Sequence, residues 1–277
     1  MKKYLLLCTL SFSLYTTVNA QEFDEAIDKL STMMISASKE QDYKTKQSYI
    51  KTFAELLEKT LKKPNSIYQN FDSIPYMKVI SSKDGIVRIY NWGIPCENGE
   101  YQYSAILQRR IGGSHNPLSD IYVLEDVRKH VNKPEEQILH CPEWYGCLYY
   151  EIVEKKDGNK TFYTLMGFDF NNLISYKKYI DILTFNPQGI PSFGAPVFVE
   201  DRGAAKCRII LEYWSKSAVH LSYHADIDKL VFNWLYPMVP ERTQDKSSYV
   251  PDVTFDGFEF KNGKWIKVKN VLLKKNL

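Results

Sequence analysis

Residues 258–268 read Phe-Glu-Phe-Lys-Asn-Gly-Lys-Trp-Ile-Lys-Val, with Asn262-Gly263 at their centre. An Asn-Gly pair flanked by alternating apolar residues is the strongest short-range signal for a two-residue β-hairpin loop, because both central positions of a type I′ turn need a positive φ angle. Such a loop places Phe260 opposite Trp265 as an aromatic cross-strand pair. This stretch is therefore predicted to form an antiparallel hairpin.

Upstream of this hairpin, the hydrophobic pattern has a period of two from about Tyr76 onward, which is typical of β-strands. Turn sequences lie at 82–85 (Ser-Lys-Asp-Gly) and 156–159 (Lys-Asp-Gly-Asn). The predicted strands cover residues 77–80, 86–92, 101–108, 121–124, 148–153, 161–168, 180–185, 197–199, 206–214, 218–223 and 229–236. Because short turns and no helices join them, the pattern predicts a mainly β fold, an antiparallel meander of hairpins. Barrel, sandwich and propeller-like arrangements stay open.

The segment before the strands has the spacing of helices instead. Apolar residues recur at helical intervals from Ile27 to Ile35 and again from Tyr49 to Leu61, and Pro64 ends the pattern. The predicted organisation is a signal peptide at 1–20, a helical arm at 22–64 and an antiparallel β domain at 68–277.

The first 20 residues have the three parts of a cleavable export signal. Lys2 and Lys3 precede an uncharged apolar stretch, and Val18-Asn19-Ala20 suits a signal peptidase. The stretch is shorter than the roughly 20 apolar residues of a membrane span. A lipoprotein signal at Cys8 is disfavoured because Leu7 stands where a small residue is needed. We therefore expect an exported protein that begins near Gln21, is periplasmic, outer-membrane-associated or secreted, and has no transmembrane segment after cleavage.

The composition limits the classes of partner. Without the two lysines of the signal, basic and acidic residues are almost equal in number, so no long-range field favours nucleic acid. An apolar fraction of 44% supports a folded core rather than disorder. The 20 tyrosines favour sheet surfaces first and a sugar-binding surface second. The lysines of the C-terminal hairpin (261, 264, 267, 269, 274 and 275) have the spacing of a solvated strand face.

Four cysteines follow the signal, at Cys96, Cys141, Cys147 and Cys207. An oxidising compartment permits disulfides, and Cys141 with Cys147 is the most plausible local pair. Four independent buried thiols are the alternative that we prefer.

No metal or cofactor site is predicted. His220 and His224 lie on or near a predicted strand, where four residues span about 13 Å at about 3.3 Å each, too far for one ion unless the strand bends. The cluster from His140 to Glu143, with Cys147, lacks the Cys-x-x-Cys pair that zinc sites usually contain. Phosphate-binding, dinucleotide-binding and serine-nucleophile motifs are absent from the sequence as well.

Five groups of segments resemble a pattern in exported proteins of the Bacteroidota for which no activity is known. They are SKDG at 82–85 with RIYNW at 88–92, ILQ at 106–108, LYYEI at 148–152, GFDFNN at 167–172, and DGF at 256–258 with GKW at 263–265. The resemblance implies a Gram-negative envelope context and transfers no catalytic residue.

Two functional hypotheses follow. The first is a non-catalytic envelope protein, a β scaffold that binds a protein or a glycan. The second is an exported hydrolase acting on glycans through paired carboxylates, for which Glu143, Glu151 and Asp169 are the acids to test. The catalytic residues are unknown at this stage, and a deep pocket with two converging carboxylates would favour the enzyme.

Overall fold

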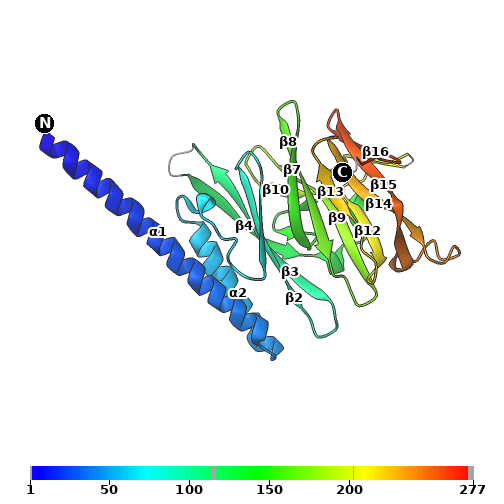
Figure 1. Ribbon diagram of the computed structural model, residues 1–277, viewed down its shortest axis with the longest axis horizontal. Coiled ribbons are helices and arrows are strands. Elements are labelled where there is room, and N and C mark those ends of the chain that lie inside the picture. The colour runs from blue at the N-terminus through cyan, green and yellow to red at the C-terminus, as the bar shows by residue number, and fades with distance from the viewer. Residues whose placement is uncertain (1, 114–116, 202, 274–277) are drawn as a thin grey trace. The chain divides into compact units, whose positions relative to one another are not determined.

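The computed structural model describes residues 2–113, 117–201 and 203–273, with the backbone alone described for residues 2–20. Its chain divides into two compact units (Figure 1). One comprises Met1–Met77 and Gln108–Ile121, and the other comprises Lys78–Leu107 and Tyr122–Leu277.

The first unit contains the helices α1 (Lys2–Lys39) and α2 (Tyr43–Leu61) and the short 3-10 helix η1 (Ser66–Tyr68). Asp42 ends the break between α1 and α2, because its carboxylate accepts a hydrogen bond from the Thr45 backbone N–H at 2.8 Å and caps α2. Leu30 and Leu57 are completely buried. The expected N-terminal helices are confirmed, although α1 extends from Lys2 and not from residue 22, and cleavage near Gln21 stays a prediction.

A buried polar cluster follows the end of α2. The Gln108 side-chain amide donates hydrogen bonds to Ser66 Oγ at 2.8 Å and to Ser119 Oγ at 3.0 Å. Ser66 Oγ donates in turn to the Leu61 carbonyl oxygen at 2.5 Å. The last turn of α2 is therefore tied to both strand segments of this unit.

In the described part of the chain, sixteen strands form three sheets. The first sheet has the order β1-β2-β3-β4-β6, with β1 (Met77–Ser81), β2 (Val87–Pro95), β3 (Tyr101–Ile111), β4 (Leu118–Asp126) and β6 (Glu143–Trp144). The second has the order β5-β10-β9-β8-β7, with β5 (Leu139–His140), β10 (Pro191–Phe193), β9 (Ser175–Phe185), β8 (Lys160–Asp169) and β7 (Leu148–Asp157), and β12 (Ile209–Trp214) also pairs with β9. The third has the order β11-β16-β15-β14-β13, with β11 (Phe198–Val199), β16 (Lys264–Val268), β15 (Tyr249–Lys261), β14 (Lys229–Pro237) and β13 (Leu221–His224).

The second sheet is buried on both of its faces. In β9, Tyr179 and Leu183 belong to a core shared with the first sheet, whereas Ile180 and Ile182 belong to a core shared with the third sheet. Because strand side chains alternate between faces, a strand covered on both sides is apolar almost continuously. The sequence left barrel, sandwich and propeller-like arrangements open. The second and third sheets pack face to face, which corresponds to a sandwich.

The C-terminal hairpin agrees with the prediction. Phe260 pairs with Trp265, and the φ angles of Asn262 and Gly263 are 49° and 72°, as a type I′ turn requires. Trp265 is completely buried, and its indole N–H donates to Thr164 Oγ1 at 3.0 Å. The hairpin is thereby fixed onto the second sheet.

The mainly β fold is confirmed, but the chain is not a simple meander. β4 pairs with β6 and β11 with β16 in parallel, over two residues each. The strand predicted at 206–214 begins at Ile209 and returns to pair with β9. Its predicted first residues instead hold the buried side chain of Arg208 and the Cys207 thiol.

Among the described residues, no helix combines the length and the apolar character needed to cross a membrane. Cys96, Cys141, Cys147 and Cys207 are all in the reduced form, so the local Cys141–Cys147 pair is not formed. Cys147 and Cys207 are buried. The Cys147 thiol lies against Gly167, where an added Cβ would come within 2.4 Å of the sulfur.

Candidate functional site

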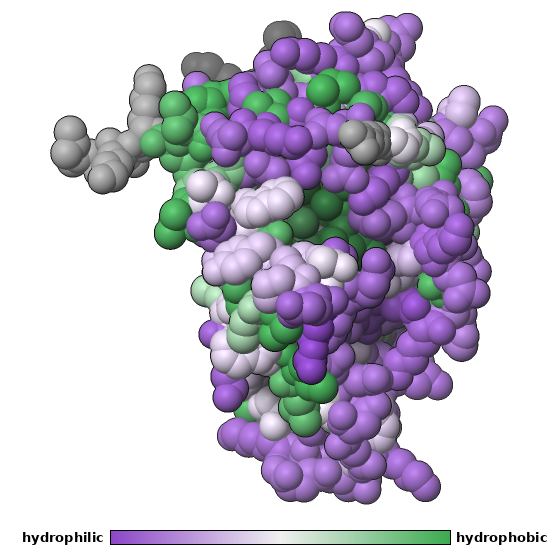
Figure 2. All heavy atoms as spheres, turned by 90° about the vertical axis from the view of Figure 1, so that its right-hand side faces the viewer, coloured by the Kyte–Doolittle hydropathy of each residue, from purple (hydrophilic) through white to green (hydrophobic). Residues whose placement is uncertain are grey.

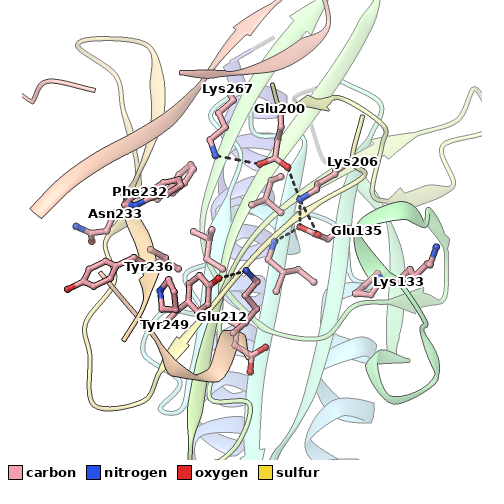
Figure 3. A pocket seen from close by; sticks show the side chains of 18 of the residues that line it. Lys133, Glu135, Glu200, Lys206, Glu212, Phe232, Asn233, Tyr236, Tyr249 and Lys267 are labelled. Atoms are coloured by element: carbon pink, nitrogen blue, oxygen red, sulfur yellow. Dashed lines mark hydrogen bonds and ion pairs between the residues drawn. The ribbon is translucent and has the colours of Figure 1, made fainter. Parts of the chain in front are cut away.

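A groove of about 640 Å³ opens between the second and third sheets. Its walls come from β12, from β14 and the start of β15, and from the segment around η3 (Pro134–Glu136). Figure 3 shows Phe232, Tyr236 and Tyr249 on one side and Glu135, Glu200 and Lys206 on the other. Segments that are distant in the sequence therefore form one site.

The floor of the groove is formed by buried residues of the hydrophobic core. Ile209 and Phe232 line the groove, yet they are only 4% and 5% exposed and belong to the core between the second and third sheets. Leu211 packs against the same core. On the face of the molecule seen in Figure 2, hydrophobic residues gather in a hollow while hydrophilic residues cover most of the surroundings. An apolar floor with a polar rim is the usual composition of a ligand site.

Exposed aromatic side chains form part of the wall. Trp234 and Tyr236 on β14 both line the groove, and each is 44% exposed. The pairing of β14 with β15 shifts register between Asn233 and Leu235, and such an irregularity redirects the side chain that lies within it. The Lys267 ammonium lies 5.5 Å from the centre of the Trp234 ring. A large indole surface is therefore available beside a charge.

Charged side chains complete the rim. Lys206 Nζ lies 2.8 Å from a carboxylate oxygen of Glu200 and 3.2 Å from one of Glu135. Lys267 Nζ lies 3.6 Å from Glu200 and 3.5 Å from Asp256. Burial lowers the pKa of Lys206, but the hydrogen bond to Glu200 and the charge of Glu135 raise it further, so the net shift is upward. Lys206 is therefore a permanent cation between two carboxylates.

Glu135 also has a structural role in this site. Its Oε1 accepts a hydrogen bond from the Ile210 backbone N–H at 3.2 Å, and its carbonyl oxygen accepts one from the Cys207 N–H at 2.6 Å. The η3 segment is thereby attached to the outer edge of β12. This attachment holds one wall of the groove in place.

The three acids suggested by the sequence do not converge. Glu143 is exposed on β6. Glu151 pairs with Met166, and Asp169 lies three residues beyond Met166 on β8, so the two carboxylates leave opposite faces of the second sheet. Burial raises the pKa of Glu151, whose carboxylate accepts a hydrogen bond from the Tyr223 N–H at 3.3 Å. None of the three lines the groove.

Asp169 instead belongs to a buried network beside a smaller pocket of about 130 Å³. Arg128 Nη1 lies 2.7 Å from Asp169, and the other guanidinium nitrogens bind Asp126 and the Tyr101 carbonyl oxygen. The Tyr179 hydroxyl donates to Asp169 at 2.9 Å. Because these groups satisfy one another, the network is structural.

The side chains of His220 and His224 lie closer together than the expected strand spacing of their backbones indicates. Their Nε2 atoms lie 3.3 Å apart, and the ring centres are 5.5 Å apart. Residues four apart on a strand share a face, and only the small Ser222 stands between the two imidazoles on it. The two long side chains lean toward each other, and this closes the distance between their rings.

Other expectations concern isolated residues. His140 Nδ1 lies 3.0 Å from Ser192 Oγ, and burial raises the pKa of the Cys141 thiol. In the described ranges, no group of three or more His, Cys, Asp or Glu side chains is arranged to hold a metal ion. Lys267, expected on a solvated face, has a side chain only 15% exposed because it turns into the groove. Lys274 and Lys275 lie outside the described residues.

No local motif marks the groove in the sequence. Lys206, Trp234 and Lys267 are separated by about 30 residues each and look like ordinary strand residues. The best signal is Trp234, which alternation along β14 places on the same face as the core residues Leu230 and Phe232 although its side chain is 44% exposed. Comparisons of the chain with models of protein families, with curated proteins and with solved structures found no match.

Proposed function

We propose that this chain is an exported, non-catalytic binding protein of the cell envelope, and that its groove takes a glycan. The observation that supports the proposal most strongly is the 44% exposed Trp234 side chain in a groove of about 640 Å³ whose rim carries paired charges. A cavity of this volume suits a ligand of a few sugar rings.

The chemistry of the groove matches that of a carbohydrate. One face of a sugar ring presents C–H groups, which pack well on the broad apolar surface of an indole or a phenol. Its hydroxyl groups need hydrogen-bond partners in fixed directions, and Glu200, Lys206 and Glu135 offer acceptors and donors that are already held in place. A site with aromatic and charged walls serves both needs.

The proposed export rests on the sequence of residues 1–20, and the envelope context rests on the resemblance to exported proteins of the Bacteroidota. A binding role at the cell surface is consistent with a scaffold of three sheets that supports one groove. Binding of a protein instead of a glycan is an outcome that the test below separates.

The test is a screen of the purified full-length protein against a panel of oligosaccharides, followed by calorimetry with the best ligand. We expect saturable binding that Trp234→Ala weakens at least about tenfold, since stacking on an aromatic ring dominates such sites. Trp214→Ala is the matched control, because Trp214 is partly exposed on β12 and does not line the groove. Failure of every glycan to bind, or equal affinity of the Trp234→Ala variant, would refute the proposal.

A hydrolase acting on glycans is the second candidate. It is favoured by one observation: Glu135 and Glu200 line the same groove and bind the same ammonium. Glycoside hydrolysis needs one carboxyl group that donates a proton, whereas both of these carboxylates accept hydrogen bonds from Lys206, so the binding role comes first. If the wild type releases reducing sugar and Glu200→Gln abolishes that release, the hydrolase becomes the favoured function and the binding protein the second.

A further inference from the structure

His220, which immediately precedes β13, and His224, which ends it, form a pair. Neither histidine lines the groove, although the His220 backbone contacts Asn233, which does. Their Nε2 atoms face each other at 3.3 Å. Without a third atom between them, one ring must carry a proton on Nε2 and donate it to the other, because two facing lone pairs repel. A metal ion would accept both lone pairs.

We propose that His220 and His224 are a two-histidine chelate for a first-row divalent metal ion, with Zn²⁺ as the best geometric fit. Zinc binds histidine nitrogen at about 2.0–2.1 Å in a tetrahedral arrangement, which separates two ligand nitrogens by about 3.3–3.4 Å. The observed Nε2–Nε2 distance of 3.3 Å equals this edge of the tetrahedron. Little rearrangement of the two side chains is therefore needed.

The surroundings hold the two rings in this geometry. The Phe255 ring contacts the His220 ring edge-on with centres 5.8 Å apart. The Ser222 hydroxyl lies 2.8 Å from His220 Nε2, the nitrogen that would bind the ion, so it must release that atom when metal binds. The His220 backbone N–H donates to Asn233 Oδ1 at 2.7 Å. A chelate needs such fixed orientations, because a freely rotating pair loses entropy on binding.

Charged side chains also lie near the pair. Glu151, on the facing strand β7, interacts with the charge of His224 and adds a negative group near the site. Lys178 is a positive group whose charge acts on His220, and burial lowers the pKa of its own ammonium.

Two protein ligands leave the other coordination positions to water. In the described ranges no group of three or more metal-binding side chains exists, and His220 is exposed. The site therefore takes an exchangeable ion, and its preference follows the general order in which Cu²⁺ binds more tightly than Ni²⁺ or Zn²⁺.

Calorimetric titration of the full chain with ZnCl₂ tests the proposal, with His220→Asn, His224→Asn and the double variant beside the wild type. We expect one site per chain and an affinity that falls at least about tenfold in each single variant, since loss of even an outer partner of a metal ligand costs that much. His130→Asn and His140→Asn are the controls, because neither side chain lies in the pair, and both should bind like the wild type.

X-ray absorption of the zinc-loaded protein should show two imidazole nitrogens at about 2.0–2.1 Å with oxygen ligands. Circular dichroism of each variant checks that it is folded. The proposal is overturned if the wild type binds no zinc, or if folded double variant and wild type bind it equally.

Discussion

Phe260 lies directly opposite Trp265 across the last hairpin, with the two ring centres 5.2 Å apart. Trp265 belongs to the core between the second and third sheets, together with Phe198 and Phe258. The turn of this hairpin is specified by the local Asn262-Gly263 sequence, whereas the core that Trp265 enters is formed by segments from distant parts of the chain.

Trp265→Ala is expected to lower the free energy of unfolding by about 3–5 kcal/mol, the usual cost of truncating a buried tryptophan. The loss includes the hydrogen bond to Thr164 as well as the apolar contacts. Urea denaturation measures it. Trp214→Ala is the control and should cost much less, since Trp214 is only partly buried. An unchanged midpoint for Trp265→Ala would mean that this indole does not support the core.

Gly263→Val is expected to destabilise the same hairpin for a different reason. The φ angle of Gly263 is +72°, which a β-branched residue resists, and an added Cβ would lie 2.6 Å from Asp157 Oδ2. Adding Asp157→Ala to the Gly263→Val variant should recover the stability lost to the steric clash with Asp157. It should not recover the stability lost to the unfavourable φ angle. Thermal unfolding distinguishes them, and a variant as stable as the wild type would contradict the turn geometry.

Asp181→Leu is expected to cost about 3–5 kcal/mol, because it leaves the fully buried Arg208 without its counter-charge. The double variant Asp181→Leu with Arg208→Leu should recover much of the loss, since a buried ion pair is often replaceable by apolar residues. A double-mutant cycle in urea measures the coupling. Additive losses would show that the two side chains do not depend on each other.

The lowered pKa of His220 predicts a pH dependence of stability. Although the His220 side chain is exposed, partial desolvation of the ring, together with the charges of His224 and Lys178, holds its folded pKa below the ordinary value of 6.5. The unfolded chain therefore takes up the proton first, so stability is present above that value and is lost as the pH falls through it. The wild type should lose more stability than His220→Asn between about pH 7.5 and about pH 5.5. If the stabilities of the wild type and of His220→Asn change with pH in parallel, the lowered pKa of His220 is contradicted.

The strands and their turns were largely readable from the sequence, because alternation and pairs such as Asn262-Gly263 act over a few residues. The hairpin of β7 and β8 was predicted from its Asp-Gly-Asn turn for the same reason. The pairing of β12 with β9 and the parallel pairing of β11 with β16 could not be predicted from the sequence. Such contacts depend on which distant segment pairs with a given sheet edge.

The groove escaped prediction for a related reason. Lys206 was part of a predicted strand and Lys267 part of a solvated face, and nothing local shows that Glu200 joins them. The histidine pair was misjudged because backbone spacing alone ignores the reach of two side chains over a serine. In both cases side-chain direction in the folded chain decides the chemistry.

The most direct measurement of the glycan-binding groove is the NMR spectrum of the five tryptophan indole N–H groups, recorded during titration with the best oligosaccharide. The resonance of Trp234 should shift and saturate, while those of the buried Trp144 and Trp265 stay in place. Assignment follows from Trp234→Ala, which removes one signal. A titration in which Trp234 does not move while the glycan binds, or in which no indole responds to any glycan, would contradict the account.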